Sequence, residues 1–244
     1  MNSMSAVSNS MSAVSNSMSA GNSMSAGNSM SARDEIMARI RASLADRPDR
    51  GRTKLNWRYG RATAMEDVLE HFVERVEDYK ARVVRTTAAD LPQAIARTLV
   101  ESDASSVVVP SGLPAEWCAA IAAVGVTVCP DTAEAPLSHA ELDAVSAVVT
   151  ASRVSIAETG TIVLDHAADQ GRRALSLLPD RHICVVRADS VVSDVPEAVA
   201  ILSRSIRDGL PATWISGGSA TSDIELERVE GVHGPRRLVV VLVE

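Results

Sequence analysis

Aromatic side chains are almost missing from this chain of 244 residues, of which they make up 2%, with Phe72 as the single phenylalanine. An excess of basic charge is missing too, because the formal net charge is −7. Nucleic-acid-binding proteins need a basic face for phosphates and, for single strands, rings on which bases stack. The composition therefore predicts no nucleic-acid partner. It also predicts an aliphatic core, since 46% of the residues are hydrophobic.

Cysteine is equally scarce, with Cys118, Cys129 and Cys184 as the whole set and no CxxC pair among them. Three thiols cannot hold a four-cysteine iron–sulfur cluster, and an odd number argues against a disulfide framework. No His, Asp or Glu spacing completes a metal site. We therefore expect no metal or cofactor in this chain, and free thiols typical of a cytoplasmic protein.

Long hydrophobic runs are also lacking. No apolar stretch reaches the roughly 18 residues that a membrane-spanning helix requires. The N-terminus has no basic segment followed by an apolar one, so a secretory signal is not predicted. We expect a protein without a membrane span.

Residues 1–32 instead form a repeat without charge, in which NSMSA begins at Asn2, Asn9, Asn16, Asn22 and Asn28. Such a segment cannot bury enough apolar surface to offset its ordering entropy, which predicts disorder. Each copy carries a methionine, which suggests the hypothesis that the functional start is Met30.

Residues 33–62 are predicted to form a helix followed by an extended basic arm. Ser31 and Asp34 resemble a capping box ahead of apolar residues at helical spacing. Residues 63–244 then form the main domain. There, Thr63 and Glu66 resemble a second capping box, and the apolar spacing that follows predicts a long helix to about Lys80.

Strands and helices alternate through the first half of this domain. Strands are expected at 83–84, 106–109, 126–128 and 147–150, with helices at 91–100, 114–124 and 138–143 between them. This order is typical of βαβ units and a parallel sheet. Further strands are expected at 154–156, 161–164, 183–186, 190–192, 212–215 and 238–243, with a helix at 195–206. Because little helix separates several of them, antiparallel pairs are expected, giving an α/β fold with a mixed, mostly parallel sheet flanked by helices.

The first candidate site is a glycine-rich turn after a predicted strand and before a predicted helix, with the residues Ser216, Gly217, Gly218, Ser219, Thr221 and Asp223. Glycines let the backbone approach a ligand, and hydroxyls and a helix N-terminus attract anions. Placement at the carboxyl end of a strand favours a binding role. The turn lacks the lysine of a Walker loop and the third glycine of a dinucleotide fingerprint. It is either a helix cap or an anion site.

The second candidate is the segment with Glu158, Thr159, Gly160 and Thr161 between two predicted strands. Its simplest interpretation is a hairpin turn with glycine at a positive φ. Alternatively, Glu158 acts there as a base, nucleophile or acceptor.

The third candidate is the basic turn with His233, Arg236 and Arg237, which enters the last predicted strand. The arginines either clamp a carboxylate or phosphate or balance an acidic surface. The basic turn at Arg172 and Arg173 has the same two interpretations.

Four stretches carry a resemblance to a known family: ETGTIVLD (158–165), GRRALSLLPDRHICVV (171–186), ISGGSATSDIELERVEGVHGPRRL (215–238) and the terminal VVVLVE (239–244). Together they resemble the lactate-utilisation protein C family (LutC/YkgG), which is built on the LUD domain. The similarity runs from about Ser31 to the end of the chain. The leading repeat lies outside the family pattern.

The resemblance implies a fold like the NagB/RpiA/CoA-transferase group and a part in the oxidation of L-lactate to pyruvate. It implies cysteine-rich iron–sulfur partners, the lactate-utilisation proteins A and B, and a cofactor-free subunit here. It supplies no established catalytic residues. By analogy with CoA-transferase-like relatives, Glu158 beside Gly160 is a candidate nucleophile. A sharper hypothesis is that Glu158, Thr159 and Thr161 face the 217–222 loop across one cleft.

Three functions therefore remain open. The chain is a non-catalytic component of a lactate-oxidising complex, a stand-alone enzyme on a small acyl, phosphorylated or folate-like substrate, or a sensor of lactate or a related anion.

Overall fold

The computed structural model describes residues 31–45, 62–221, 229–231 and 233–244. The chain divides into two units, Met1–Asn56 and Trp57–Glu244. The predicted disorder of 1–30, the start at Met30 and the arm at 46–61 lie outside the described residues, as does Asp223. The division into 1–32, 33–62 and 63–244 stays a prediction.

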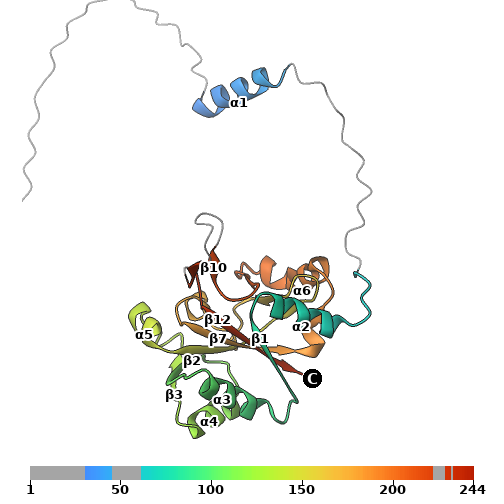
Figure 1. Cartoon of the computed structure of the whole chain (residues 1–244). Helices are drawn as coiled ribbons and strands as arrows, with labels where there is room; N and C mark the ends of the chain where they lie inside the picture. Colours follow the sequence, from blue (N-terminus) through green and yellow to red (C-terminus); the bar gives the residue numbers. More distant parts are fainter. Residues whose placement is uncertain (1–30, 46–61, 222–228, 232) are drawn as a thin grey trace, which may run out of the picture. The chain divides into compact units, whose positions relative to one another are not determined.

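The first unit contributes one described helix, α1 (Ala32–Ser43) (Figure 1). Its N-cap is Ser31, whose Oγ accepts a hydrogen bond from the Asp34 amide at 3.2 Å. This cap confirms the predicted helix start. Ile36, Ile40 and Leu44 are exposed.

In the second unit, a six-stranded sheet runs in the order β1-β12-β7-β4-β2-β3, and each neighbouring pair in it is parallel. Its strands are β1 (Arg82–Thr86), β2 (Ser106–Pro110), β3 (Thr127–Asp131), β4 (Ala147–Ala151), β7 (Arg181–Arg187) and β12 (Arg237–Val243). Valine dominates these strands because a sheet covered on both faces buries both sets of alternating side chains. The α/β fold, with a mostly parallel sheet flanked by helices, is confirmed.

One face of this sheet is covered by α3 (Leu91–Glu101) and α4 (Ala115–Ala123). Ile95, Leu99 and Ile121 pack there against strand residues such as Val149 and Val185. The cluster contains only apolar side chains.

The antiparallel strands form a separate four-stranded sheet in the order β8-β5-β6-β9. Its strands are β5 (Val154–Ile156), β6 (Thr161–Leu164), β8 (Val191–Val192) and β9 (Thr213–Ile215). The pairs β5–β6 and β6–β9 are antiparallel, whereas β5–β8 is parallel.

This small sheet lies between the large sheet and α6 (Val195–Arg207). Its Ile162 and Leu164 pack with Cys184 and Val240 of the large sheet. The other face of the small sheet packs against Ala198 and Leu202 of α6. The antiparallel strands therefore add a layer on the second face of the parallel sheet.

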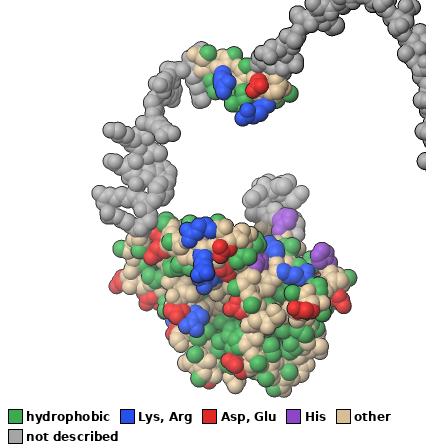
Figure 2. Space-filling view, turned by 180° about the vertical axis from the view of Figure 1, so that it is seen from behind, with side chains coloured by type: hydrophobic (Ala, Val, Ile, Leu, Met, Phe, Trp, Pro, Cys, Tyr) green, Lys and Arg blue, Asp and Glu red, His purple; other side chains and the backbone are tan. Residues whose placement is uncertain are grey.

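The same second face is completed by α2 (Val68–Asp78), and by α5 (His139–Ala144) with the short 3-10 helix η1 (Arg173–Ser176). A further 3-10 turn, η2 (Ala188–Ser190), precedes β8. On the face of the second unit seen in Figure 2, charged side chains gather toward the end that carries α2 and α6, and hydrophobic ones toward the end that carries α3 and α4. None of the helices among the described residues is both long and apolar enough to span a bilayer.

The predicted capping box at Thr63 and Glu66 is wrong. The N-cap of α2 is Asp67, whose Oδ1 accepts hydrogen bonds from the amides of Leu69 and Glu70, each at 3.0 Å. Thr63 instead donates through its amide and hydroxyl to Oδ2 of Asp194, 131 positions away. A tertiary partner thus outweighs the local one.

The helix predicted after the glycine-rich turn is not found where the chain is described. Ala220 and Thr221 form β10 (Ala220–Thr221), which pairs antiparallel with β11 (Val229–Glu230). The rest of that predicted helix, residues 222–228, lies outside the described residues.

Candidate functional site

Two of the predicted segments, 158–161 and the glycine-rich turn, meet in the structure. The Oγ atoms of Thr161 and Ser216 lie 2.8 Å apart, and those of Thr159 and Thr161 lie 2.7 Å apart. They meet because β6 pairs with β9, with Ile162 opposite Ile215. The hydroxyls bond directly, so these two segments are joined rather than facing each other across an open cleft.

Gly160 occupies the tight position of the second segment, between the antiparallel strands β5 and β6, which confirms the hairpin interpretation. Its φ is +57°, and a Cβ there would lie 2.8 Å from the backbone carbon of Arg75 in α2. A side chain is therefore excluded by both conformation and contact.

Glu158 lies exposed on the same turn, and its amide donates to the carbonyl of Ser193 at 3.0 Å. It does not line the cavity at the glycine-rich turn. The structure adds no support to a catalytic role, which stays a prediction.

The glycine-rich turn is pressed against its neighbours. A Cβ on Gly217 would lie 2.6 Å from Cβ of Tyr79, and one on Gly218 would lie 2.5 Å from the carbonyl oxygen of Arg236. Ser219 fixes the turn to the third segment, because its amide donates to the Pro235 carbonyl at 2.8 Å and its Oγ accepts from the His233 amide at 3.0 Å. The first and third predicted segments therefore form one wall.

The two arginines of the third segment border a separate hollow of about 380 Å³, which Gly218 of the glycine-rich turn also lines. Arg236 Nη1 lies 2.6 Å from Oδ1 of Asp180, and both side chains are substantially exposed. Arg237 is exposed as well. An arginine clamp beside the glycine-rich turn stays a prediction.

A cavity of about 250 Å³ lies beneath this wall, and we call it the His182 cavity. Its described lining residues are Arg173, Ser176, His182, Thr213, Trp214, Ile215, Ser216, Gly217, Gly218, Ser219, Ala220, His233, Gly234, Pro235 and Leu238. His182 and Leu238 are second residues of β7 and β12, so the cavity opens at the amino ends of these parallel strands. The glycine-rich turn does follow the carboxyl end of a strand, as expected, but that strand is β9 of the small sheet. Ligands of open parallel sheets bind at the carboxyl ends of the parallel strands, so this general rule does not support the His182 cavity.

His182 is the most deeply buried polar group of the cavity, at 1% exposure. Its Nε2 lies 2.8 Å from Oγ1 of Thr150, which in turn lies 3.7 Å from Sγ of Cys184. Burial, with a smaller contribution from the positive charge of Arg173, lowers the pKa of His182 to about 4. The imidazole is therefore neutral at neutral pH.

Arg173 supplies the positive charge in the wall of the cavity. It begins η1, and its Nη1 donates to Oγ of the buried Ser176 at 3.2 Å. Arg173 also borders a second hollow of about 520 Å³ that contains Asp131 and His166. Arg173 thus borders both hollows.

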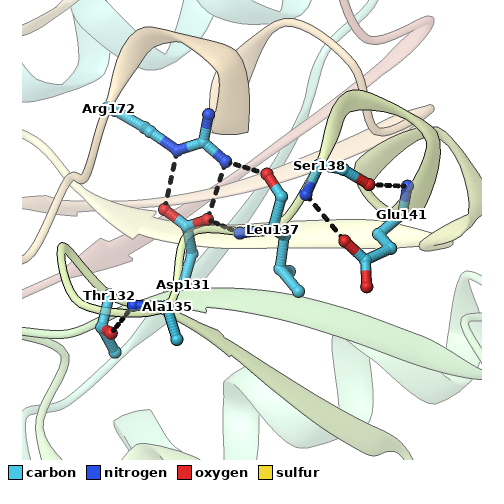
Figure 3. A network of polar contacts seen from close by, with 7 residues as sticks. All are labelled: Asp131, Thr132, Ala135, Leu137, Ser138, Glu141 and Arg172. Carbon is cyan, nitrogen blue, oxygen red and sulfur yellow. Dashed lines mark hydrogen bonds and ion pairs between the residues drawn. The ribbon is translucent and has the colours of Figure 1, made fainter.

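The neighbouring Arg172 anchors the turn that carries Arg173 (Figure 3). Its Nε and Nη2 donate to the two carboxylate oxygens of Asp131 at 2.9 and 2.8 Å, a bidentate geometry that fixes orientation. Burial alone would raise the pKa of Asp131, but the hydrogen bonds from Arg172 and from the Leu137 amide hold it below its usual 3.8. The basic turn at 172–173 is therefore divided: Arg172 is held by Asp131, and Arg173 borders the His182 cavity.

His166 holds the far side of the same turn. It has a φ of +60°, which is rare for a residue other than glycine. Its Nδ1 lies 2.8 Å from the Gly171 carbonyl oxygen and its Nε2 lies 2.8 Å from Oγ1 of Thr213 in β9. The histidine thereby ties the loop before η1 to the small sheet. In the part of the chain that the structure describes, no group of three or more His, Cys, Asp or Glu could hold a metal ion.

Comparison with known proteins identifies the fold and its relatives. The family model of the LUD domain matches residues 69–243. The chain belongs to the LUD domain family. It is 57% identical over 177 residues to Lactate utilization protein C of Deinococcus radiodurans, covering 72% of this chain and 80% of that protein. It is 31% identical over 205 residues to Lactate utilization protein C of Bacillus pumilus, covering 78% and 84%.

A solved structure agrees with this LUD domain assignment. The crystal structure of a DUF162 family protein from Deinococcus radiodurans matches with a TM-score of 0.62 and 51% identity. The match covers 72% of this chain and 96% of that one. The fold of the second unit is thus shared with a protein of known structure.

Sequence reasoning considered Arg173 only as part of a basic turn, and it did not identify Ser176 or His182, which also line this LUD domain cavity. A signal for His182 was present, because it is a polar residue within the apolar strand stretch RHICVV. Its alternation with Ile183 placed it on the same face as Cys184. Only the packing of η1 and β9 above that face turns it into the floor of a cavity.

Proposed function

We propose that this LUD domain protein takes part in lactate utilisation, as a non-catalytic subunit or accessory protein in the oxidation of L-lactate to pyruvate. The observation that carries the proposal is the match to proteins named Lactate utilization protein C over most of both chains. The domain match over residues 69–243 supports it.

The redox chemistry belongs in this proposal to iron–sulfur partners, the lactate-utilisation proteins A and B. This chain has three cysteines, one fewer than a four-cysteine cluster needs. Burial raises the pKa of the Cys184 thiol to about 12 and also raises the pKa of Cys118. Such thiols are poor nucleophiles and poor metal ligands, which favours a structural role for them.

The test of the process is growth. A strain that lacks this gene, in a background without another L-lactate oxidase, should fail to grow on L-lactate and should grow normally on pyruvate. The gene restored on a plasmid should rescue growth. Normal growth of the deletion strain on L-lactate would overturn the proposal.

The test of the partnership is purification from lactate-grown cells. The tagged chain should retain proteins A and B through size-exclusion chromatography, and iron analysis should assign the iron to those partners. Recovery of the chain alone under these conditions, with proteins A and B in other fractions, would contradict the subunit role.

A lactate-sensing role is a second candidate, and the positive charge of Arg173 in the cavity wall favours it. A sensor predicts that deletion changes transcription of lactate-induced genes, whereas a subunit predicts lost lactate oxidation in extracts with unchanged transcription. A stand-alone enzyme predicts turnover of substrate by the purified chain without partners.

A further inference from the structure

We propose that the His182 cavity binds a small carboxylate that carries an oxygen on the adjacent carbon, a 2-hydroxy or 2-keto acid, with Arg173 holding the carboxylate. The choice of L-lactate and pyruvate as ligands rests on the proposed function. The assignment of a carboxylate site rests on the cavity itself.

Charge is the first argument. Among the described residues that line the cavity, Arg173 is the one permanent cation and none is Asp or Glu. This lining stands out in a chain with a net charge of −7. A guanidinium can hold a carboxylate by two parallel hydrogen bonds, which a diffuse surface charge cannot do.

Hydroxyl groups in the cavity lining hold the guanidinium and supply a further donor. Ser176 is 4% exposed; its Oγ accepts from Arg173 Nη1 and donates to the Arg173 carbonyl oxygen, so it orients the arginine. Ser219 accepts a hydrogen bond from the His233 amide. Because a hydroxyl that accepts can still donate its own hydrogen, Ser219 can also bind an anion.

His182 supplies the recognition of the second oxygen. Thr150 occupies its Nε2, at 2.8 Å, so Nδ1 is the ring nitrogen left for a ligand. A neutral imidazole can donate to a keto oxygen or accept from a hydroxyl, depending on the tautomer. A ligand without this oxygen could not form this hydrogen bond and should bind more weakly.

Size is the last argument. The cavity holds about 250 Å³, less than the roughly 300–1,000 Å³ typical of sites for drug-sized ligands. A volume of this size accommodates a metabolite of a few carbons.

The experiment is calorimetric titration of the full chain with L-lactate, pyruvate, propionate and inorganic phosphate. We expect saturable binding of L-lactate or pyruvate. Propionate, which has the carboxylate but no second oxygen, should bind at least 10-fold more weakly. Arg173→Gln should weaken binding at least 10-fold, and Arg173→Lys should weaken it less because the charge stays.

Arg97→Gln is the matched control, since Arg97 is an exposed arginine on α3. It should bind like the unmodified protein. His182→Asn should reduce the discrimination between L-lactate and propionate, an effect that a merely structural role would not produce. A thermal melt of each variant checks that it is folded. Should His182→Asn fail to fold, the propionate comparison on the unmodified protein still tests the second oxygen.

Each outcome decides between site and process. No binding of L-lactate or pyruvate, or equal binding by the Arg173→Gln variant, overturns the carboxylate site even where the deletion strain fails on lactate. Tighter binding of phosphate than of either acid also overturns it. Binding with normal growth of the deletion strain on lactate leaves the site standing and removes the proposed function.

Discussion

The two faces of the six-stranded sheet differ in chemistry although the same strands build both. Under α3 and α4, β7 contributes Ile183 and Val185 to a wholly apolar cluster. On the other face, the same strand contributes His182 and Cys184, which lie near Thr150 of β4. Side-chain alternation along a strand thus separates a face that only stabilises the domain from a face that also carries polar groups.

The difference has a structural origin. Helices can cover an apolar sheet face completely, as the side chains of α3 and α4 do. A short twisted sheet and the single turn of η1 leave gaps, and the His182 cavity is one of them. Buried polar groups need hydrogen-bond partners, and at such a gap the partner can be a ligand or another polar side chain.

The largest expected effect is on the apolar face. Leu99 of α3 is fully buried against the sheet, so Leu99→Ala should lower the free energy of unfolding by about 2–5 kcal/mol, through lost transfer energy and a residual cavity. Urea denaturation measures it. The neighbouring Val100 is 50% exposed, and Val100→Ala should change stability by less than about 0.5 kcal/mol. Similar losses for both variants would contradict this assignment of the core.

On the polar face, stability should depend on pH through His182. Its pKa is about 4 in the folded protein, whereas a histidine in the unfolded chain has a pKa of about 6.5. Below pH 6.5 only the unfolded state gains the proton, so the free energy of unfolding falls on acidification and levels off below about pH 4. The loss by that point is about 3 kcal/mol.

Urea titrations at pH 7 and pH 4.5, compared with the His182→Asn variant, isolate this effect. The contribution of Asp131, whose pKa lies below 3.8, is lost only at lower pH. Burial raises the pKa of Asp169, which acts in the opposite direction, but it does so in both proteins and cancels in the comparison. Equal pH dependence in the two proteins would show that His182 is not buried as a neutral group.

Substitutions at two glycines separate the cost of a steric clash from the cost of a strained backbone conformation. A Cβ on Gly218 would lie 2.5 Å from the Arg236 carbonyl oxygen, so Gly218→Ala should shift the turn, cost about 1–3 kcal/mol and weaken ligand binding. Gly125 has a φ of +83° and no atom within 4 Å of a built Cβ. Gly125→Ala should cost about 1 kcal/mol from backbone strain alone and leave binding unchanged. Chemical denaturation and calorimetry measure both quantities.

The smallest expected effect concerns the start of α2. Asp67→Ala removes the side chain that accepts from two helix amides and should cost about 1 kcal/mol. Glu66 belongs to the predicted capping box that the structure does not contain, so Glu66→Ala should change the free energy of unfolding by less than about 0.5 kcal/mol. A larger loss from Glu66→Ala, measured by thermal unfolding, would restore the sequence-based assignment.

Much of the fold could be predicted from the sequence because its signals are local. The expected strands at 154–156 and 161–164 match β5 and β6 residue for residue. Proline at the start and Gly125 at the end bracketed α4 to within one residue at each end. Periodicity, caps and glycines depend on neighbours within a few positions, so the sequence displays them directly.

The candidate site was predicted only in part. Ser216, Gly217, Gly218, Ser219 and His233 line the His182 cavity, as a ligand-binding prediction for them requires. Of the other predicted site residues that the structure describes, Glu158, Thr159, Gly160 and Thr161 lie in the hairpin turn, Thr221 lies in β10, and Arg236 and Arg237 border a separate hollow. The glycines in the sequence indicated where the backbone packs closely against its neighbours. They could not indicate which side chains that packing brings together.

The sequence by itself determined the order and type of most elements, the aliphatic core and the family resemblance, because each depends on residue type and short-range spacing. Only the tertiary structure decided that the strands divide into two sheets, that Thr63 bonds Asp194 and that Arg173 and His182 share a cavity. These outcomes depend on contacts between residues far apart in the chain, where competing partners differ by small free energies and no local pattern records which one prevails.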